Sequence, residues 1–494
     1  MDTLPEKKTV ILIHPSPVKI ILDAVPKLVP LSILSVASTI PEEYSILLID
    51  RAVNRNDVEF IDILKTRNVV CVGLSVLTGY SILDSIHCSK LIRETTPNIP
   101  IVWGGWHASA DPQSILEKEY VDFVVKGEAE VTFPELLQTL SGQSNNLEIP
   151  GVCYRDGHNY VVQPPLPPLE LDELPYLPFH LLGDMRPYYF FNFVPEGGNC
   201  LELETSRGCP YGCTFCEISN QFGSNYKFLS PERMVEQIRT LKETYGIGGI
   251  KFQDANLFLS IKRIRKFAQL LIDQNIDIKW GGDGTIMQFK NISFEDLELF
   301  QKSGLRVVTF GIESGNEEFR YQIQKKFTNE DVYRVQDHFF KLGMQFRFNM
   351  IVGFPGESFE QSVETVDFTV DLLSRNPQMS ISTGISFYLP IPGTPMSLEA
   401  EKLGYVFPRT LEEHGQLSFF TGSNSRVWLS KSEANKLSTI SHISRFLNHP
   451  KNQIPLKGLG RIAFLILRNY VIFRFRNHMF SVTLDLLFLR KVLP

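Results

Sequence analysis

Short apolar runs alternate with segments of helical spacing along most of the 494-residue chain, and this alternation limits the fold more than any other feature. Strands that alternate with helices form parallel sheets whose two faces are both covered by helices. We therefore expect a doubly wound parallel α/β sheet in an N-terminal domain at residues 1–145. Its expected strands are residues 10–14, 45–50, 69–76, 100–105 and 121–127, with helical spacing at 31–40, at 81–94 and from 111 onward.

A second array of the same kind begins near residue 199. Its expected strands are residues 201–205, 249–254, 278–282, 307–312, 346–352 and 381–389. Residues that favour helix N-caps follow the first five strands: Ser230, Ser260, Ser293, Thr328 and Ser358. Six repeats fall short of the eight in a complete barrel, so a partial (β/α)6 barrel, open on one side, is expected over residues 199–425. The proline-rich stretch 146–198 is interpreted as a linker between the two domains.

The formal net charge of −6 and the pI near 6.0 argue against a general nucleic-acid binder, which needs an exposed basic face. The N-terminus shows no apolar leader, and no charge-free apolar run reaches the roughly 20 residues of a membrane-spanning helix. Four of the seven cysteines are scattered, at Cys71, Cys88, Cys153 and Cys200, which fits a reducing compartment better than a disulfide framework. We expect a cytoplasmic protein.

The other three cysteines, Cys209, Cys213 and Cys216, follow the first strand of the second array, where a barrel presents its chemistry. Three thiolates hold three irons of a cubane cluster and leave the fourth iron an open coordination position. The alternative is a structural zinc site or a closed four-cysteine cluster that recruits Cys200. That residue lies at the far end of a strand roughly 17 Å long, which argues against the alternative.

The spacing CxxxCxxC in this position resembles the radical S-adenosylmethionine (SAM) enzymes. The resemblance implies a [4Fe-4S] cluster whose open iron binds SAM, and an external flavodoxin- or ferredoxin-like electron donor. One electron then cleaves SAM to a 5'-deoxyadenosyl radical. Phe215 is expected against the adenine, and Gln253 with Asp254 at the SAM amino group, where the family's usual GGE is absent. Glu313 and Ser314 are expected at the ribose and carboxylate.

Polar and glycine residues follow the strands of the first array, where an open parallel sheet binds ligands. These residues are Ser75, Thr78, Gly104, Gly105, His107, Gly127 and Glu128. Glycines there let a large planar ligand approach the backbone, although they also serve as tight turns. Ahead of a radical SAM barrel, this sheet resembles the cobalamin-binding domain of the B12-dependent subclass. The DxHxxG motif is absent, so cobalamin is expected without a histidine ligand, and His107 beside the corrin or its tail.

Cobalamin and SAM together imply an enzyme, most commonly in this subclass a methyltransferase. It would act on an unactivated carbon or a phosphinate phosphorus of a small or apolar substrate. In the carbon case the resemblance implies that the radical abstracts a hydrogen and that methylcobalamin supplies the methyl group. Two alternatives stay open. One is an oxidative cyclase or ring-rearranging enzyme without methyl transfer, and the other is a non-catalytic sensor of B12 or redox state.

Residues 451–494 carry eight basic residues and one acidic residue among apolar and aromatic ones. They form the tail of a C-terminal helical region expected at residues 426–494. The tail is predicted either to pack across the open side of the barrel or to make a peripheral contact with an anionic membrane surface.

Overall fold

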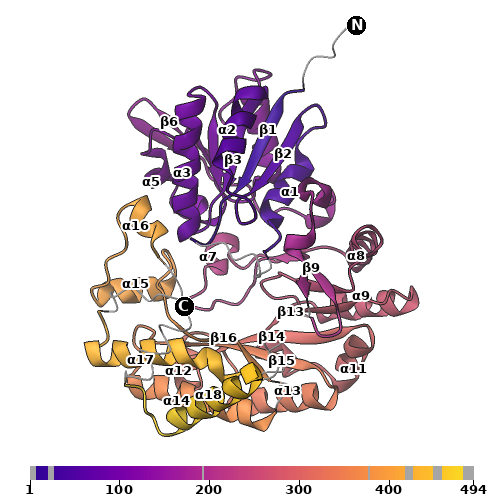
Figure 1. The fold of residues 1–494 in the computed structure, drawn as a ribbon, viewed down its shortest axis with the longest axis vertical. Helices are drawn as coiled ribbons and strands as arrows, with labels where there is room; N and C mark the ends of the chain where they lie inside the picture. The colour runs from indigo at the N-terminus through magenta and orange to yellow at the C-terminus, as the bar shows by residue number, and fades with distance from the viewer. Residues whose placement is uncertain are drawn as a thin grey trace.

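The computed structural model describes residues 7–19, 27–191, 194–376, 379–417, 427–448 and 459–481. An N-terminal α/β unit, indigo to purple in Figure 1, stands over a second α/β unit formed by the later part of the chain. The expected order of the two folds along the chain is confirmed.

The N-terminal sheet has the strand order β2-β1-β3-β4-β5-β6-β7. Its parallel strands are the five expected ones: β1 Thr9–His14, β2 Ser45–Asp50, β3 Val69–Ser75, β4 Ile101–Gly104 and β5 Phe123–Val125. Its helices are α1 Leu31–Thr39, α2 Asp57–Thr66, α3 Tyr80–Thr95, α4 Trp106–Ala110, α5 Pro112–Leu116 and α6 Ala129–Leu140. One buried apolar cluster includes residues of α2, α3 and α5, and a second includes residues of α1 and α6, so both faces of the sheet are covered.

The sheet continues into the segment expected to be a linker. Strands β6 Val152–Asp156 and β7 Asn159–Val162 form an antiparallel hairpin that pairs with β5. The turn falls at Gly157, whose φ of 58° is easily adopted by glycine. An Asp-Gly pair between alternating apolar residues is a strong hairpin signal, and it went unrecognised beside the prolines that follow. The rest of the segment holds three short 3-10 turns, η1 Leu171–Glu173, η2 Phe179–Leu182 and η3 Arg186–Tyr188.

The second sheet has the order β16-β15-β14-β13-β12-β9-β8, with six parallel strands and an antiparallel edge strand, β8 Phe190–Phe191. The six are β9 Asn199–Leu203, β12 Gly249–Phe252, β13 Lys279–Gly284, β14 Leu305–Glu313, β15 Gln345–Val352 and β16 Ser380–Phe387. This confirms the partial barrel. A short antiparallel ribbon pairs β10 Ser206–Arg207 with β11 Lys227–Phe228. Between its two strands lie residues 209–216, which contain the three clustered cysteines and are called the cysteine segment.

Helices follow the barrel strands as the sequence predicted. They are α7 Ile218–Phe222, α8 Pro231–Tyr245, α9 Ile261–Asp273, α10 Ile286–Phe289, α11 Phe294–Lys302, α12 Glu317–Gln322, α13 Asn329–Lys341 and α14 Phe359–Arg375. All five expected N-cap residues accept a hydrogen bond from the first turn of their helix. Local capping chemistry therefore sets where these helices begin.

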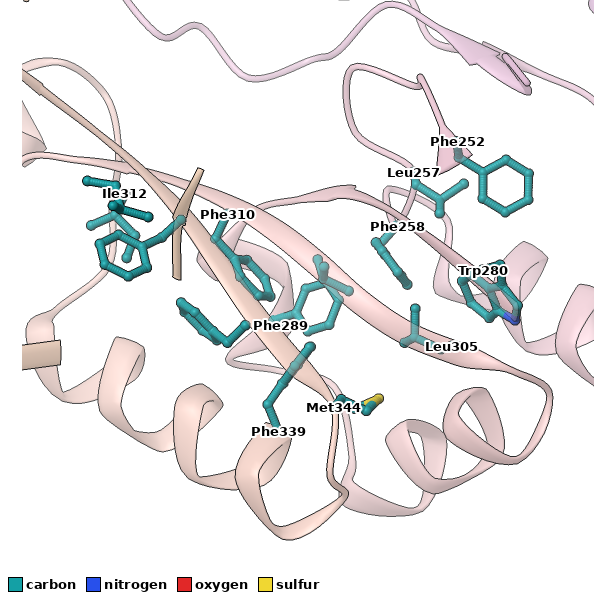
Figure 2. Close-up of a cluster of buried hydrophobic side chains, with 14 of the residues drawn as sticks. Phe252, Leu257, Phe258, Trp280, Phe289, Leu305, Phe310, Ile312, Phe339 and Met344 are labelled. Carbon is teal, nitrogen blue, oxygen red and sulfur yellow. The ribbon is translucent and has the colours of Figure 1, made fainter. Parts of the chain in front are cut away.

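The main apolar core lies between the barrel strands and their helices, and Figure 2 shows part of it. Phe310 of β14 packs against Phe289 of α10, with ring centroids 4.8 Å apart, and against Phe339 of α13, at 5.5 Å. Such side chains leave each strand on its helix side. The residues that alternate with them therefore face the barrel interior.

After β16 the chain returns to the N-terminal domain. It passes through α15 Pro395–Lys402 and then α16 Leu411–Gly415, which lies beside α3 (Figure 1). Leu411 is buried in the N-terminal core, and Glu412 lies 3.5 Å from the ammonium of Lys118. This return segment ties the two domains together a second time.

The C-terminal region packs α17 Lys431–Ser444 and η4 Arg445–Leu447 against β16, an edge strand of the barrel sheet. Helix α18 Leu459–Arg476 packs on η4 and α14, so the described part of the tail lies over helices of the barrel. Its outward face exposes an apolar stripe formed by Ile462, Ile466, Tyr470 and Phe473. Residues 426, 449–458 and 482–494 of the predicted region lie outside the described residues. Within the described ranges, no helix combines the length and apolar content needed to span a bilayer.

Candidate active site between the two domains

A cavity of about 790 Å³ lies between the carboxyl edge of the N-terminal sheet and the barrel. Five of the seven predicted strand-end residues line it: Ser75, Gly104, Gly105, Gly127 and Glu128. From the barrel side, Glu204, Arg207 and Gln253 reach the same space. The cavity lies at the edge of the sheet where ligands were predicted to bind, and its volume is in the range of cofactor sites.

At Gly104, Gly105 and Gly127 the cavity is lined by backbone atoms, because these residues have no side chain. Gly105 has a φ of 92°, and a Cβ placed there would lie 2.7 Å from the backbone nitrogen of Val76. A side chain at this position would therefore clash and strain the turn. The Ser75 hydroxyl lies beside Gly105, 3.2 Å from the position of that Cβ, and 3.0 Å from the hydroxyl of Ser32. A flat ligand could approach this wall of the cavity closely, which fits the corrin expected from the sequence.

His107 and Thr78 lie behind this wall and do not line the cavity. The Thr78 hydroxyl is 3.2 Å from Nδ1 of His107, and the imidazole ring lies 5.2 Å from that of His414 on α16. Burial, with His414 as a neighbour, lowers the pKa of His107 to about 4. In the described part of the chain no histidine lines the cavity.

The cysteine segment leaves β10 through Gly208, whose φ is 84° and where a Cβ would lie 2.2 Å from the carbonyl oxygen of Asn225. Cys213 is buried, and Cys209 and Cys216 are partly exposed. Among the described residues, no three His, Cys, Asp or Glu side chains converge closely enough to hold a metal ion in this conformation.

Cys200 lies apart from the other three cysteines. It sits near the start of β9, buried in a small cluster with Val194 and Val307, and its thiol is 3.6 Å from the carbonyl oxygen of Gly198. A Cβ added at Gly249 would lie 2.4 Å from its sulfur. This packing fits the prediction that Cys200 is not a cluster ligand.

Lys325, which the sequence analysis missed, is the cation that acts on all three cysteines. Burial raises the pKa of the three thiols, and the ammonium of Lys325 acts in the opposite direction. Its Nζ lies 3.2 Å from Glu313 and donates to the carbonyl oxygen of Gly311 at 3.0 Å. A cation beside three thiolates offsets the negative charge of a cluster, so the residues fit the expected group.

A second unforeseen residue, Arg320, holds the loop that carries Lys325. The Arg320 side chain is fully buried, and it donates to the carbonyl oxygens of Phe327 and Ser314. The same loop accepts a 3.4 Å hydrogen bond from the Thr214 amide, through the carbonyl of Ile323, and so joins the cysteine segment. Nothing in the local pattern of this loop marks it as part of a site, because its role arises only from tertiary packing.

The residues expected around SAM divide into two groups. Gln253 lines the cavity, Glu313 pairs with Lys325, and the ring of Phe215 lies 6.0 Å from the Lys325 ammonium. Asp254 and Ser314 are buried, and their side chains are hydrogen-bonded to other residues of the protein. Asp254 accepts from the backbone and side chain of Thr205 and from the Ser206 hydroxyl, and the Ser314 hydroxyl lies 3.2 Å from that of Thr365. These two hold the turns in place.

Arg207 connects the cysteine segment to the N-terminal domain. Its guanidinium lies 2.6 Å from Glu128, 2.8 Å from Glu130 and 2.8 Å from Glu204. Three carboxylates around one cation leave an excess of negative charge, and burial raises the pKa of Glu204 although Arg207 opposes that shift. This ion-pair group fixes the cysteine segment against the strand-end loops that line the cavity.

Comparison with known proteins gives matches for both domains. Residues 203–369 match the Radical SAM superfamily, and residues 18–137 match the B12 binding domain. An uncharacterised methyltransferase of Pyrococcus horikoshii is 30% identical over 370 residues, 74% of this chain and 77% of that protein. Cytidylyl-2-hydroxyethylphosphonate methyltransferase of Streptomyces wedmorensis is 26% identical over 387 residues, 72% of this chain and 70% of that protein.

The same arrangement of folds occurs in a solved structure. The cobalamin-dependent SAM radical enzyme OxsB, with aqua-cobalamin and SAM bound, superposes with a TM-score of 0.73 at 18% identity. The match covers 95% of this chain and 71% of that one. At this identity the likeness establishes a shared fold.

Proposed function

The chain belongs to the cobalamin-binding radical SAM enzymes, and on that premise we propose that it is a methyltransferase using a [4Fe-4S] cluster, SAM and cobalamin. The cavity carries the proposal, because it joins the strand ends of the N-terminal sheet to the residues that flank the cysteine segment. A methyl carrier and a radical source would then face one shared space, where a substrate can be held in register with both.

In this proposal Cys209, Cys213 and Cys216 hold the cluster, which supplies the electron that cleaves SAM, while cobalamin supplies the methyl group. The protein's own part is to place and shield the reactants. Phe215 packs against the adenine of SAM, and Gln253 accepts from its amino group. These roles are supported by the position of Phe215 beside Lys325 and of Gln253 in the cavity wall.

Glu313 is proposed to contact the ribose of SAM from the end of β14. Its φ of 71° is unusual for a residue with a side chain, and its carboxylate is held by Lys325. Backbone strain of this kind persists where the surrounding structure demands one orientation of a functional group. Ser314 and Asp254 act on SAM indirectly, by holding the turns that carry Glu313 and Gln253.

Methyl transfer is favoured over cyclisation because both relatives described above are named methyltransferases. The test compares metabolites of cells that express the wild-type chain with those of cells that express Cys213→Ser. We expect a metabolite that gains one methyl group only with the wild type. A product that loses two hydrogens without gaining carbon would instead support the cyclase, and identical metabolite profiles would contradict both enzymatic functions.

We further propose that a flavodoxin- or ferredoxin-like protein supplies the electron and that the enzyme works in the cytoplasm. None of the seven cysteines forms a disulfide in the described part of the chain, which supports a reducing compartment. A reduced flavodoxin should replace a chemical reductant in driving SAM cleavage by the reconstituted protein. If no flavodoxin or ferredoxin did so, this part of the proposal would fail.

The apolar stripe on α18 supports the proposed peripheral contact with an anionic membrane. Phe473 on this stripe is 55% exposed, and so is Phe340 on α13, which provides a matched control. In liposome flotation at low salt, we expect Phe473→Glu to lose binding and Phe340→Glu to keep it. A wild-type chain that does not float with anionic liposomes would remove the membrane contact.

A further inference from the structure

Four ionisable side chains, Glu202, Lys251, Asp283 and Arg347, lie in the barrel strands on the inner face of the sheet. Glu202 pairs in register with Lys251 on the neighbouring strand. Asp283 pairs with Thr309, and Thr309 pairs in turn with Arg347. The interior of a closed (β/α)8 barrel is normally filled by branched apolar side chains. We call these four residues the charged layer.

The alternation of burial along β15 shows that Arg347 lies on the partly exposed face of the sheet. Phe346, Phe348 and Met350 are buried in the core on the helix side of the sheet, and Phe310 of β14 belongs to the same core (Figure 2). Arg347 and the other residues that alternate with them are partly exposed. Along β15 the inner face is therefore less closely covered than the face that meets the helices.

The charged layer is costly to maintain, because removing charge from water without full compensation is unfavourable. Glu202 is buried and accepts from Lys251 at 3.0 Å and from the Val29 amide at 3.0 Å. Burial raises the pKa of Asp283 to about 6 and lowers that of Arg347 to about 10. An interior that served stability alone would not need these groups, so a binding role is the more economical explanation.

The charged layer also lies within reach of the reaction. Glu202 accepts a hydrogen bond from Gln253, which lines the interdomain cavity. Along β14, Thr309 is two residues from Gly311, whose carbonyl oxygen accepts from Lys325 beside the cysteines. Two residues of strand span roughly 7 Å. A molecule bound at the charged layer would therefore lie just beneath the SAM site and open toward the cavity.

We propose that the substrate is a small water-soluble molecule with a carboxylate or phosphate group, which Arg347 binds inside the barrel. This inference rests on the proposed methyltransferase function and names the substrate class of that same site. The planar guanidinium donates in the fork geometry that matches a carboxylate or phosphate. Arg347 donates to Gln345 at 3.1 Å, and Lys251 is balanced by Glu202. Asp283, which accepts from the Thr309 hydroxyl, can also accept from hydroxyl or amino groups on the rest of the molecule.

The test uses the full chain, reconstituted with cluster and cobalamin, and extracts of cells in which the gene is inactive. A deproteinised aqueous extract and a chloroform extract are added separately with SAM and reductant. S-adenosylhomocysteine and 5'-deoxyadenosine are then measured above the level without extract. We expect the aqueous extract to raise both products and the active material to be retained on an anion exchanger.

Variants at one position sharpen the test. Arg347→Met should keep its cluster and cobalamin by absorbance and need at least about tenfold more aqueous extract for the same rate, while Arg347→Lys recovers part of the loss. Arg334→Met, a half-exposed arginine on the outer helix α13, is the matched control and should behave as the wild type.

The remaining outcomes of these experiments each contradict a different part of the proposal. Stimulation by the chloroform extract alone overturns the water-soluble class but leaves methyl transfer intact. Aqueous material that passes through the anion exchanger, or an equal response of Arg347→Met and the wild type, overturns the anionic group at Arg347. If neither extract raises either product, the proposed function fails together with the inference.

Discussion

The buried ion pair of Lys325 and Glu313 allows a quantitative prediction for the variant Lys325→Met. The two side chains are 11% and 8% exposed, and Nζ lies 3.2 Å from Oε1. At an effective dielectric constant of 20, Coulomb attraction at this distance is about 5 kcal/mol. Methionine fills similar space without a charge, so Glu313 would remain buried without its cation. Removing one partner of a buried pair costs about 3–5 kcal/mol, and we expect a loss in that range.

The assay is anaerobic urea unfolding of the protein without its cofactors, followed by tryptophan fluorescence. Lys326→Met is the matched control, because Lys326 is the exposed neighbour on the same loop and should change stability by less than about 0.5 kcal/mol. The double variant Lys325→Met with Glu313→Gln should recover at least half of the loss, since no charge is then stranded. A Lys325→Met protein within about 1 kcal/mol of the wild type would refute the reasoning.

Two further predictions concern cluster binding and acid stability. Serine at Cys209, Cys213 or Cys216 should abolish the brown chromophore of the reconstituted protein, and Cys200→Ser should retain it; equal loss in all four would contradict the open-iron arrangement. Burial holds the pKa of His107 near 4, below its ordinary value, so the unfolded chain binds the proton more tightly. The stability that this group contributes is present above about pH 6.5 and is lost toward pH 4, by about 3 kcal/mol in total. The free energy of unfolding should therefore fall less steeply from pH 7 to pH 5 in His107→Gln, and parallel pH profiles would contradict this.

The features that the sequence predicted are those determined by local chemistry. Strand bounds followed from apolar runs, and helix starts from capping residues such as Ser230 and Thr328. The three cysteines and the glycines at strand ends could be singled out as candidates, because their spacing and backbone freedom are local properties. The hairpin at Gly157 carried a local signal that the neighbouring prolines obscured.

The missed residues act through contacts between distant segments. Arg207 pairs with glutamates of the other domain, and His414 reaches His107 only because the chain returns after the barrel. Lys325 comes from a loop between two outer helices and meets the cysteines through tertiary packing. The charged layer inside the barrel required the register of neighbouring strands before its residues could be seen as one group.

The most direct measurement of the central claim is the ratio of the two SAM products in the presence of substrate. Radical methylation consumes one SAM as methyl donor and another as radical source. We therefore predict S-adenosylhomocysteine and 5'-deoxyadenosine in about equal amounts, after uncoupled cleavage is subtracted, with the label of methyl-deuterated SAM retained in the product. Deoxyadenosine without matching S-adenosylhomocysteine, and a product without label, would contradict methyl transfer and favour cyclisation or rearrangement.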